Sequence, residues 1–160
     1  MKIINAFPGV GEPMNEEETK NFMANNDNTL LVRIGIIDEK GEANVIPLAY
    51  YFDSAINKIY INTLKTTKKV QSLRKNNVIA YCIDDPKFPF KGVRGKGTVK
   101  IHEDVSHNID IAKKFIMKNI GSLDDPNAKW LLNEIENGNE VILEITPKYY
   151  STWRAAVPAK

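Results

Sequence analysis

Hydroxyl and ammonium groups are concentrated in one short stretch of this chain of 160 residues, YINTLKTTKKVQSLRK at residues 60–75. The stretch begins as an alternating strand and continues as a short helical pattern over residues 66–75. No carboxylate occurs between Ser54 and Ile83, so nothing nearby in sequence neutralises the lysines. This composition is expected where a strand is followed directly by the N-terminus of a helix.

Such a corner attracts a phosphate, because unpaired backbone N–H groups, the positive end of the helix dipole and side-chain cations coincide there. Lysine in a first helical turn is unfavourable unless an anion is bound. The alternative is a solvent-exposed, lysine-rich turn with no ligand. The sequence favours a phosphate-binding corner, formed by Thr63, Lys65, Thr66, Thr67, Lys68 and Lys69.

Positive charge is unevenly distributed along the chain, although the net charge is only +2. Between Ser54 and His102 there are eleven of the 22 basic residues and only two acids, Asp84 and Asp85. This bias indicates a local anionic ligand rather than a uniformly basic surface. It also leaves open a non-enzymatic nucleic-acid-binding barrel, in which aromatic side chains would stack on bases. The candidates for stacking are Tyr50, Tyr51, Tyr60 and Phe88.

Common catalytic signatures are absent: the sequence has no GxGxxG, GxxxxGK[ST], HExxH, CxxC or GxSxG motif. Catalytic residues therefore stay unassigned. His102 and His107 are five residues apart, but no further ligands with metal-site spacing stand out, so no metal is expected. No apolar run approaches the length of a membrane span and no signal-peptide core begins the chain, so a cytoplasmic location is expected.

The order of the expected elements favours a mainly β fold. An irregular arm covers residues 1–13, and a helix begins at Asn15, which forms a capping box with Glu18. Strands are expected at 29–38, 42–53, 58–63, 78–84, 92–102 and 140–147, the last extended by 148–153. Helices are expected at 66–75, 104–120 and from about 124 to 138.

The first three strands follow one another without crossover helices, which argues against a parallel α/β sheet. We therefore expect one domain over residues 1–160, an antiparallel Greek-key β-barrel with peripheral helices, and a helical segment at 103–138 before the closing strands. Pro47 indicates a sheet edge, a bulge, or a place where something other than a strand faces the backbone. Gly95 and Gly97 leave one face of a strand bare, which permits a tight bend or close approach by another group.

Five motifs in order give the chain a specific resemblance. They are a short helix after Met14, the hairpin RIGIID-KGEANVIPLAYYFD, the segment KIYINTLKTTKKVQSLRKNNVIAYCID, the strand VRGKGTVKI and the C-terminal ITPKYYSTW. Together they resemble the FMN-binding split-barrel family, whose members are pyridoxamine 5′-phosphate oxidase-like, over roughly residues 14–154.

The resemblance implies FMN as the cofactor, held between two subunits of a homodimer. Thr63, Thr67, Lys68 and Lys69 would bind its phosphate, with Lys65 and Thr66 nearby. The isoalloxazine ring would be lined, partly through backbone groups, by Val45, Ile46, Pro47 and Leu48. Lys91 and Trp153 would contribute from the second subunit.

One departure from the family limits the activity that the resemblance implies. The family's C-terminal arginine and histidine substrate motif is absent, since only Arg154 follows Trp153. The chain is therefore not expected to be a true pyridoxamine phosphate oxidase. It is expected to be a flavin-dependent oxidoreductase of unknown substrate, exchanging hydride at flavin N5. Split barrels that bind a deazaflavin or haem are the alternatives.

Overall fold

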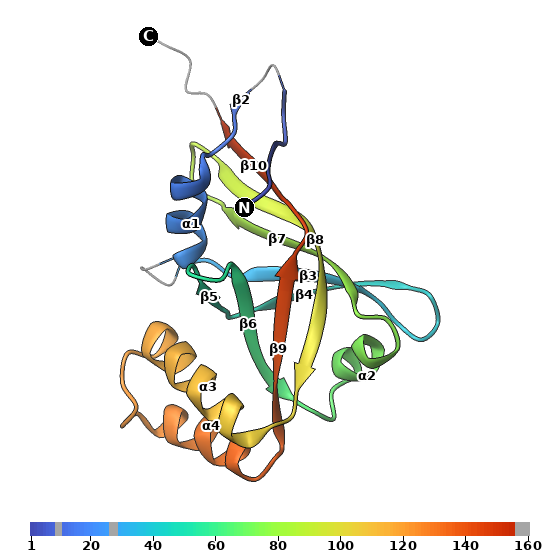
Figure 1. The fold of residues 1–160 in the computed structure, drawn as a ribbon, viewed down its shortest axis with the longest axis vertical. Coiled ribbons are helices and arrows are strands. Elements are labelled where there is room, and N and C mark those ends of the chain that lie inside the picture. Colours follow the sequence, from blue (N-terminus) through green and yellow to red (C-terminus); the bar gives the residue numbers. More distant parts are fainter. Residues whose placement is uncertain (9–10, 26–28, 156–160) are drawn as a thin grey trace.

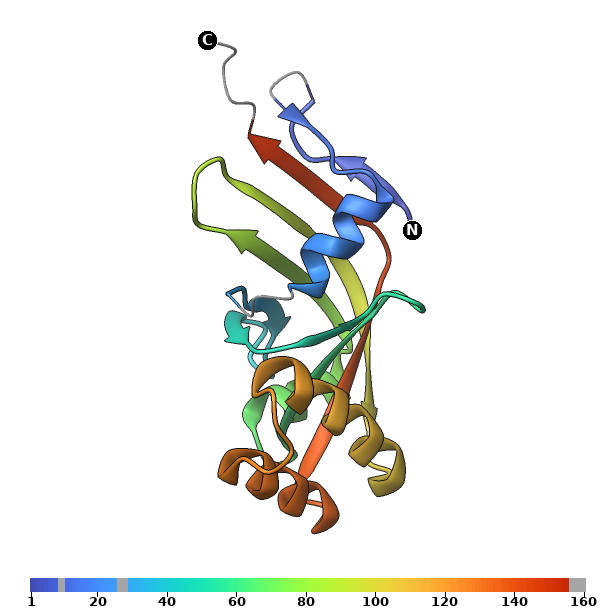
Figure 2. The ribbon, with the colours of Figure 1, turned by 90° about the vertical axis from the view of Figure 1, so that its left-hand side faces the viewer.

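The computed structural model describes residues 1–8, 11–25 and 29–155, and its main feature is a strongly curled sheet (Figures 1 and 2). Strands lie in the order β4-β3-β7-β8-β9-β6-β5, and β10 pairs with β8, β1 and β2. All pairs are antiparallel except that of β1 with β10. The bounds are β1 Ile3–Asn5, β2 Gly11–Glu12, β3 Val32–Ile37, β4 Ala43–Leu48, β5 Tyr51–Asp53, β6 Lys58–Leu64, β7 Val78–Asp85, β8 Lys91–His102, β9 Glu140–Pro147 and β10 Tyr150–Ala155. The expected mainly β, antiparallel class is confirmed.

Four helices lie around this sheet in the described part of the chain: α1 Glu16–Ala24, α2 Lys68–Lys75, α3 Val105–Asn119 and α4 Pro126–Glu136. The capping box of α1 forms as expected, because Asn15 Oδ1 accepts the Glu18 N–H at 2.9 Å and Glu18 Oε2 accepts the Asn15 N–H at 2.8 Å. Aspartates cap α3 and α4. The N-cap of α2 is Thr67, whose side chain caps no N–H of the described residues.

The sheet can curl because strand β8 carries glycines where other backbone comes close. A β-carbon on Gly95 would lie 2.8 Å from the Tyr81 ring and nearer still to the carbonyl oxygen of Tyr149. The Tyr81 hydroxyl donates a hydrogen bond to that same carbonyl at 2.7 Å. Strands β9 and β10 meet at this point, so one half of β8 pairs with β9 and the other half with β10. The close approach expected at the bare face of this strand is confirmed.

Apolar side chains fill the concave side of the sheet. The largest of the fully buried ones there are Met23, Ile34, Tyr50, Ile59, Ile61, Leu73, Ile79, Ile83 and Leu143. A second cluster joins α3 to α4, and a small third cluster of Tyr60, Ile111 and Ile142 attaches α3 to the convex side of β6 and β9. The helix pair thus covers the outside of the sheet at the end opposite the N-terminal strands (Figure 1).

Two expectations about the elements were wrong. The strand expected at 42–53 is two strands, β4 and β5, which lie at opposite ends of the sheet order. The chain turns inward between them, because Tyr50 is fully buried and its hydroxyl donates to the carbonyl of Met23 at 2.8 Å. The arm expected to be irregular contributes β1 and β2, which pair with β10. Pro47 does lie on an edge strand, since β4 pairs only with β3 among the described strands.

Among the described residues, none of the helices has both the length and the apolar character needed to cross a bilayer.

Replacing Gly95 with alanine tests the close approach at β8. We expect Gly95→Ala to lower the free energy of unfolding by about 1–3 kcal/mol, because the new methyl group overlaps the Tyr149 carbonyl and the Tyr81 ring. Urea denaturation measures the change. The matched control is Gly35→Ala, since a β-carbon there meets Ala80 Cβ at an ordinary 3.6 Å. Equal losses in both variants would contradict this account of the curl.

Candidate functional site

The corner between β6 and α2 presents an open helix N-terminus. Residues 65–67 connect the two elements, and Thr67 has the extended backbone of an N-cap, with φ −68° and ψ 148°. Its hydroxyl donates back to the carbonyl of Leu64 at 3.0 Å and so does not cap the helix. The first turn also lacks an acidic residue. Backbone N–H groups there consequently have no side-chain acceptor among the described residues, which suits an anionic ligand.

Lys69 is held in this corner by a hydrogen bond. Its Nζ donates to Thr63 Oγ1 at 2.6 Å, and Thr63 is buried near the end of β6. Burial lowers the pKa of Lys69, because the charged form is partly removed from water. The lysine ammonium is therefore positioned beside the helix N-terminus before any ligand arrives.

A buried carboxyl group, Glu140, lies close to this lysine. It begins strand β9 and pairs in register with Leu64, the last residue of β6. Burial raises the pKa of Glu140 to about 7, against the opposing effect of Lys69 and with a further increase from Glu134. Its Oε2 has no hydrogen-bond partner among the described residues. Near neutral pH the group is therefore only partly ionised, and it repels an incoming anion less than a full carboxylate would.

The other residues expected at the corner lie on its surface. Lys65, Thr66 and Lys68 are exposed. Lys68 lines a hollow of about 240 Å³ between α2 and the β3–β4 turn. Its other lining residues are Asp38, Glu39, Lys40, Gln71 and Ser72. The structure thus brings the predicted phosphate residues together, with Lys69 inward and Lys68 on the side that faces the β3–β4 hairpin.

Strand β4, expected to line a flavin ring, alternates between two environments. Val45 is 70% exposed and Pro47 is exposed, whereas Ile46 and Leu48 pack against the core. Because β4 has only β3 as a neighbour among the described strands, its outer backbone N–H and C=O groups have no strand partner. The strand can therefore offer backbone hydrogen bonds along its edge and the Val45 side chain on the convex face.

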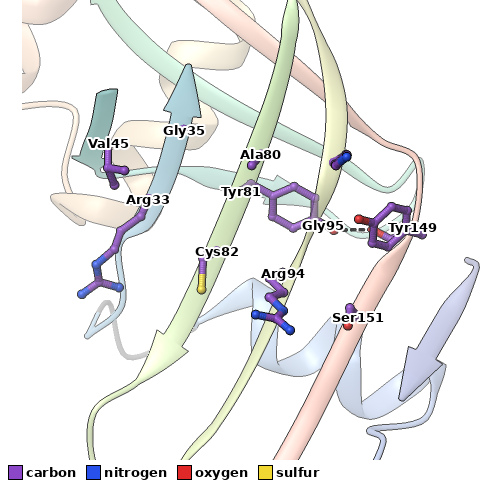
Figure 3. A pocket seen from close by; sticks show the side chains of 11 residues that line it. Arg33, Gly35, Val45, Ala80, Tyr81, Cys82, Arg94, Gly95, Tyr149 and Ser151 are labelled. Carbon is purple, nitrogen blue, oxygen red and sulfur yellow. Dashed lines mark hydrogen bonds between the residues drawn. The ribbon is translucent and has the colours of Figure 1, made fainter. Parts of the chain in front are cut away.

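A hollow of about 540 Å³ extends from Val45 across the convex face of the sheet (Figure 3). We call it the sheet hollow; its lining residues are Arg33, Gly35, Val45, Ala80, Tyr81, Cys82, Arg94, Gly95, Lys96, Tyr149 and Ser151. Small residues form its floor, since Gly35 pairs in register with Ala80. Arg33 and Arg94 flank Cys82, and Arg33 forms an ion pair with Asp84. Its volume lies within the range of small-molecule sites.

The sequence analysis missed the sheet hollow, because its residues come from β3, β4, β7, β8, β10 and the β9–β10 connection, which are spread over residues 33–151. The available signal was the outward alternation of small and basic residues in β3, β7 and β8, at Gly35, Ala80 and Arg94.

Lys91 and Trp153 do not lie at the β6–α2 corner of this chain. They lie on neighbouring strands, since Lys91 pairs with Arg154 and Trp153 pairs with Gly92. This pair is at the end of the sheet near α1, whereas α2 lies toward the other end (Figure 1). Their expected contribution from a second subunit stays a prediction.

Two of the aromatic residues considered for base stacking are unavailable for it. Tyr50 and Tyr60 are buried, and the Tyr60 ring stacks on Tyr51 with centroids 6.1 Å apart. Packing therefore explains these aromatics, and only Phe88 of the four is a strongly exposed side chain.

Glu140→Gln tests the buried carboxyl at the corner. The pKa of Glu140 is higher in the folded state than its ordinary value of 4.5, so the folded state binds the proton more tightly. The contribution of this group to the free energy of unfolding is therefore greatest below pH 4.5 and is lost as the pH rises through 7. We expect urea unfolding at pH 5 and pH 8 to show this decline, by up to about 3 kcal/mol, and to show less of it in Glu140→Gln. Identical pH dependence in the two proteins would contradict the assignment.

Comparison with known proteins shows the fold. No family model matches the chain, and no curated protein matches it in sequence. A solved structure of the conserved hypothetical protein Rv2991 from Mycobacterium tuberculosis superposes with a TM-score of 0.78 at 16% identity, covering 98% of this chain and 96% of that one. An FAD-binding protein from Mesorhizobium loti gives 0.66 at 17% identity, covering 91% and 98%.

A third structure is a protein related to general stress protein 26, of the pyridoxinephosphate oxidase family, from Clostridium acetobutylicum. It gives a TM-score of 0.64 at 20% identity and covers 88% of this chain and 91% of that one. The same fold occurs in an F420 reductase and in HutZ, the haem storage protein of Vibrio cholerae, with TM-scores of 0.61 and 0.64. The chain therefore has the split-barrel fold that its sequence motifs predict.

Proposed function

We propose that this chain binds FMN at the interface of a homodimer and acts as a flavin-dependent oxidoreductase. The observation that carries the proposal is the β6–α2 corner, where Lys69 is held on Thr63 beside an uncapped helix N-terminus. A phosphate dianion there would accept hydrogen bonds from backbone N–H groups and from a lysine ammonium. Thr67 and Lys68 would complete the clamp from the start of the helix.

A flavin ring needs an apolar surface and hydrogen-bond partners for its polar edge. Within Val45, Ile46, Pro47 and Leu48, the residues of β4 that do not hydrogen-bond to β3 alternate with those that do, and their backbone groups face the free edge. The sheet hollow begins at Val45. Pro47 has no N–H, so its backbone can only accept a hydrogen bond. These features support placing the ring along β4, with its phosphate tail toward α2.

A second subunit would complete the site. The convex face around the sheet hollow exposes Val45, Val78 and Ile37, an apolar surface of the kind found at protein interfaces. Lys91 and Trp153 are remote from their own corner, and they would reach the flavin of the partner subunit only across such an interface. This role for them rests on the family resemblance.

The chemistry would come from the flavin, which supplies hydride exchange with a substrate when it is bound. This chain's residues would bind the phosphate, orient the ring along β4 and exclude water from one of its faces. No nucleophile or general base is assigned. Neighbours with the same fold include an FAD-binding protein and an F420 reductase, which supports a flavin or a deazaflavin as the ligand. A haem storage protein also has this fold, so haem stays the alternative.

The first experiment identifies the cofactor. We expect the purified protein, or the protein after incubation with FMN, to show a flavin absorption spectrum, and mass spectrometry of the denatured protein to release FMN. Release of a deazaflavin or haem would replace FMN by that cofactor. A colourless protein that takes up none of the three would contradict the proposal.

Lys69→Met tests the phosphate clamp while keeping the aliphatic stem of the side chain. We expect FMN to bind about 10–100-fold more weakly, since a hydrogen bond to a charged group contributes about 1.5–3 kcal/mol. Riboflavin, which lacks the phosphate, should bind equally to variant and wild type. Quenching of flavin fluorescence measures both affinities. Lys20→Met is the control, because Lys20 lies on α1 and pairs with Glu16 at 2.9 Å. Equal loss for FMN and riboflavin would place the phosphate elsewhere.

Val45→Asp tests the ring end and the interface together. Because Val45 is 70% exposed, the variant should fold normally. We expect FMN and riboflavin both to bind about tenfold more weakly or worse, because a carboxylate would be buried against the ring. Sedimentation should also show a weaker dimer. Ile56→Asp, at another exposed apolar residue, serves as control. Unchanged affinity and assembly in Val45→Asp would exclude β4 from the site.

A further inference from the structure

Two histidines and a glutamate converge on the convex side of the sheet, beneath the start of α3. His102 ends strand β8, Glu144 lies on β9 and His107 is in the first turn of α3. One ligand atom from each of the three lies within 4.8 Å of the other two. The geometry points to a binding site for a divalent transition-metal ion of the zinc type, with His102, His107 and Glu144 as its ligands.

The separations suit such an ion. Zinc takes imidazole nitrogen and carboxylate oxygen at about 2.0–2.1 Å, so two ligand atoms of a tetrahedral site are about 3.3 Å apart. His102 Nε2 and Glu144 Oε2 are 3.0 Å apart, and the two imidazole rings have centroids 4.3 Å apart. A small side-chain rotation would therefore bring all three ligand atoms around one ion.

A buried imidazole nitrogen without a hydrogen-bond partner is independent evidence for a ligand. Nε2 of His107 is buried and has no hydrogen-bond partner among the described residues. A buried polar atom without a partner is costly, and a bound ion would remove that cost.

The surroundings fix the glutamate in a ligating position. Lys58 Nζ donates to Glu144 Oε1 at 3.0 Å, and the Tyr60 hydroxyl lies 3.4 Å from Oε2. Lys58 thus holds one carboxylate oxygen and leaves the other directed at the histidines, as outer-sphere partners do in metal sites. The Asp104 cap orients the first turn of α3, since its Oδ1 accepts the His107 N–H at 2.8 Å.

The ligand types select the metal. Imidazole suits zinc, copper, nickel and iron, whereas magnesium and calcium prefer oxygen ligands. Three protein ligands leave a fourth position for water or a small molecule, which is the arrangement of open zinc sites. The ion would tie the helix pair α3–α4 to strands β8 and β9. The small cluster of Tyr60, Ile111 and Ile142 also holds this junction, as does the hydrogen bond that Asn108 Nδ2 donates to the His102 carbonyl at 2.9 Å.

Sequence reasoning expected no metal, because Glu144 is far from the histidines along the chain. The pairing of β8 with β9 brings it beside His102, since Glu144 is in register with Lys100 on the neighbouring strand.

Titration with zinc tests the assignment in the tag-free, chelator-treated protein. We expect calorimetry to show one ion per chain. The chain has only two histidines, so NMR of ¹⁵N-histidine-labelled protein should show both imidazoles shifting together up to one equivalent of Zn²⁺. Excess Mg²⁺ should leave these signals unchanged. Absence of binding, or a shift of one imidazole alone, would overturn the proposal without requiring any variant.

Variants locate the third ligand. His107→Ala and Glu144→Gln should each weaken zinc binding by at least about 100-fold. Loss of a residue that only supports a ligand weakens metal binding by about 10–100-fold, so a larger loss indicates a direct ligand. Glu103→Gln is the matched control, because Glu103 is next to His102 in sequence but its exposed side chain pairs with Arg74 at 2.7 Å. Zinc affinity unchanged in folded Glu144→Gln, or reduced equally in the control, would also overturn the assignment.

Discussion

The open N-terminus of helix α2 is the feature around which the proposed cofactor site is organised. Three other helices of the described chain begin with a side-chain cap, at Asn15, Asp104 and Asp125. Thr67 instead turns its hydroxyl back to Leu64, while Lys69 reaches inward to Thr63. Lysines in the first turn oppose the helix dipole, so the corner is electrostatically unfavourable as it stands and becomes favourable when it holds an anion. This imbalance is what the phosphate would relieve.

The curled sheet determines which surface the rest of a phosphate-bearing ligand would contact. Because β4 is an edge strand and the sheet hollow lies on the convex face beside it, a ligand extending from the α2 corner meets unpaired backbone and then a shallow apolar surface. The curl depends on close backbone contact at Gly95, where β9 gives way to β10. Fold and site are thus linked through the same three strands, β7, β8 and β10. The helix pair α3–α4 packs on the same convex side further along, where the histidine cluster lies.

Several local features of the fold could be predicted from the sequence. The capping box at Asn15, the helix after Thr67 and the edge position of Pro47 each follow from one residue type in a fixed local pattern, and all are present in the structure. The residues that were missed share a different property. Glu140, Glu144 and the small residues of the sheet hollow become significant only through strand pairing, which brings together residues far apart in the chain. The division of 42–53 into β4 and β5 was missed for a similar reason, since the turn is imposed by burial of Tyr50 against α1.

The most direct test of the account is a crystal structure of the protein with FMN. We expect the phosphate within hydrogen-bond distance of Lys69 Nζ and of backbone N–H groups in the first turn of α2, with the ring along the edge of β4 between two subunits. A phosphate that points into solvent, or that is bound at another surface with the α2 corner left empty, would contradict it.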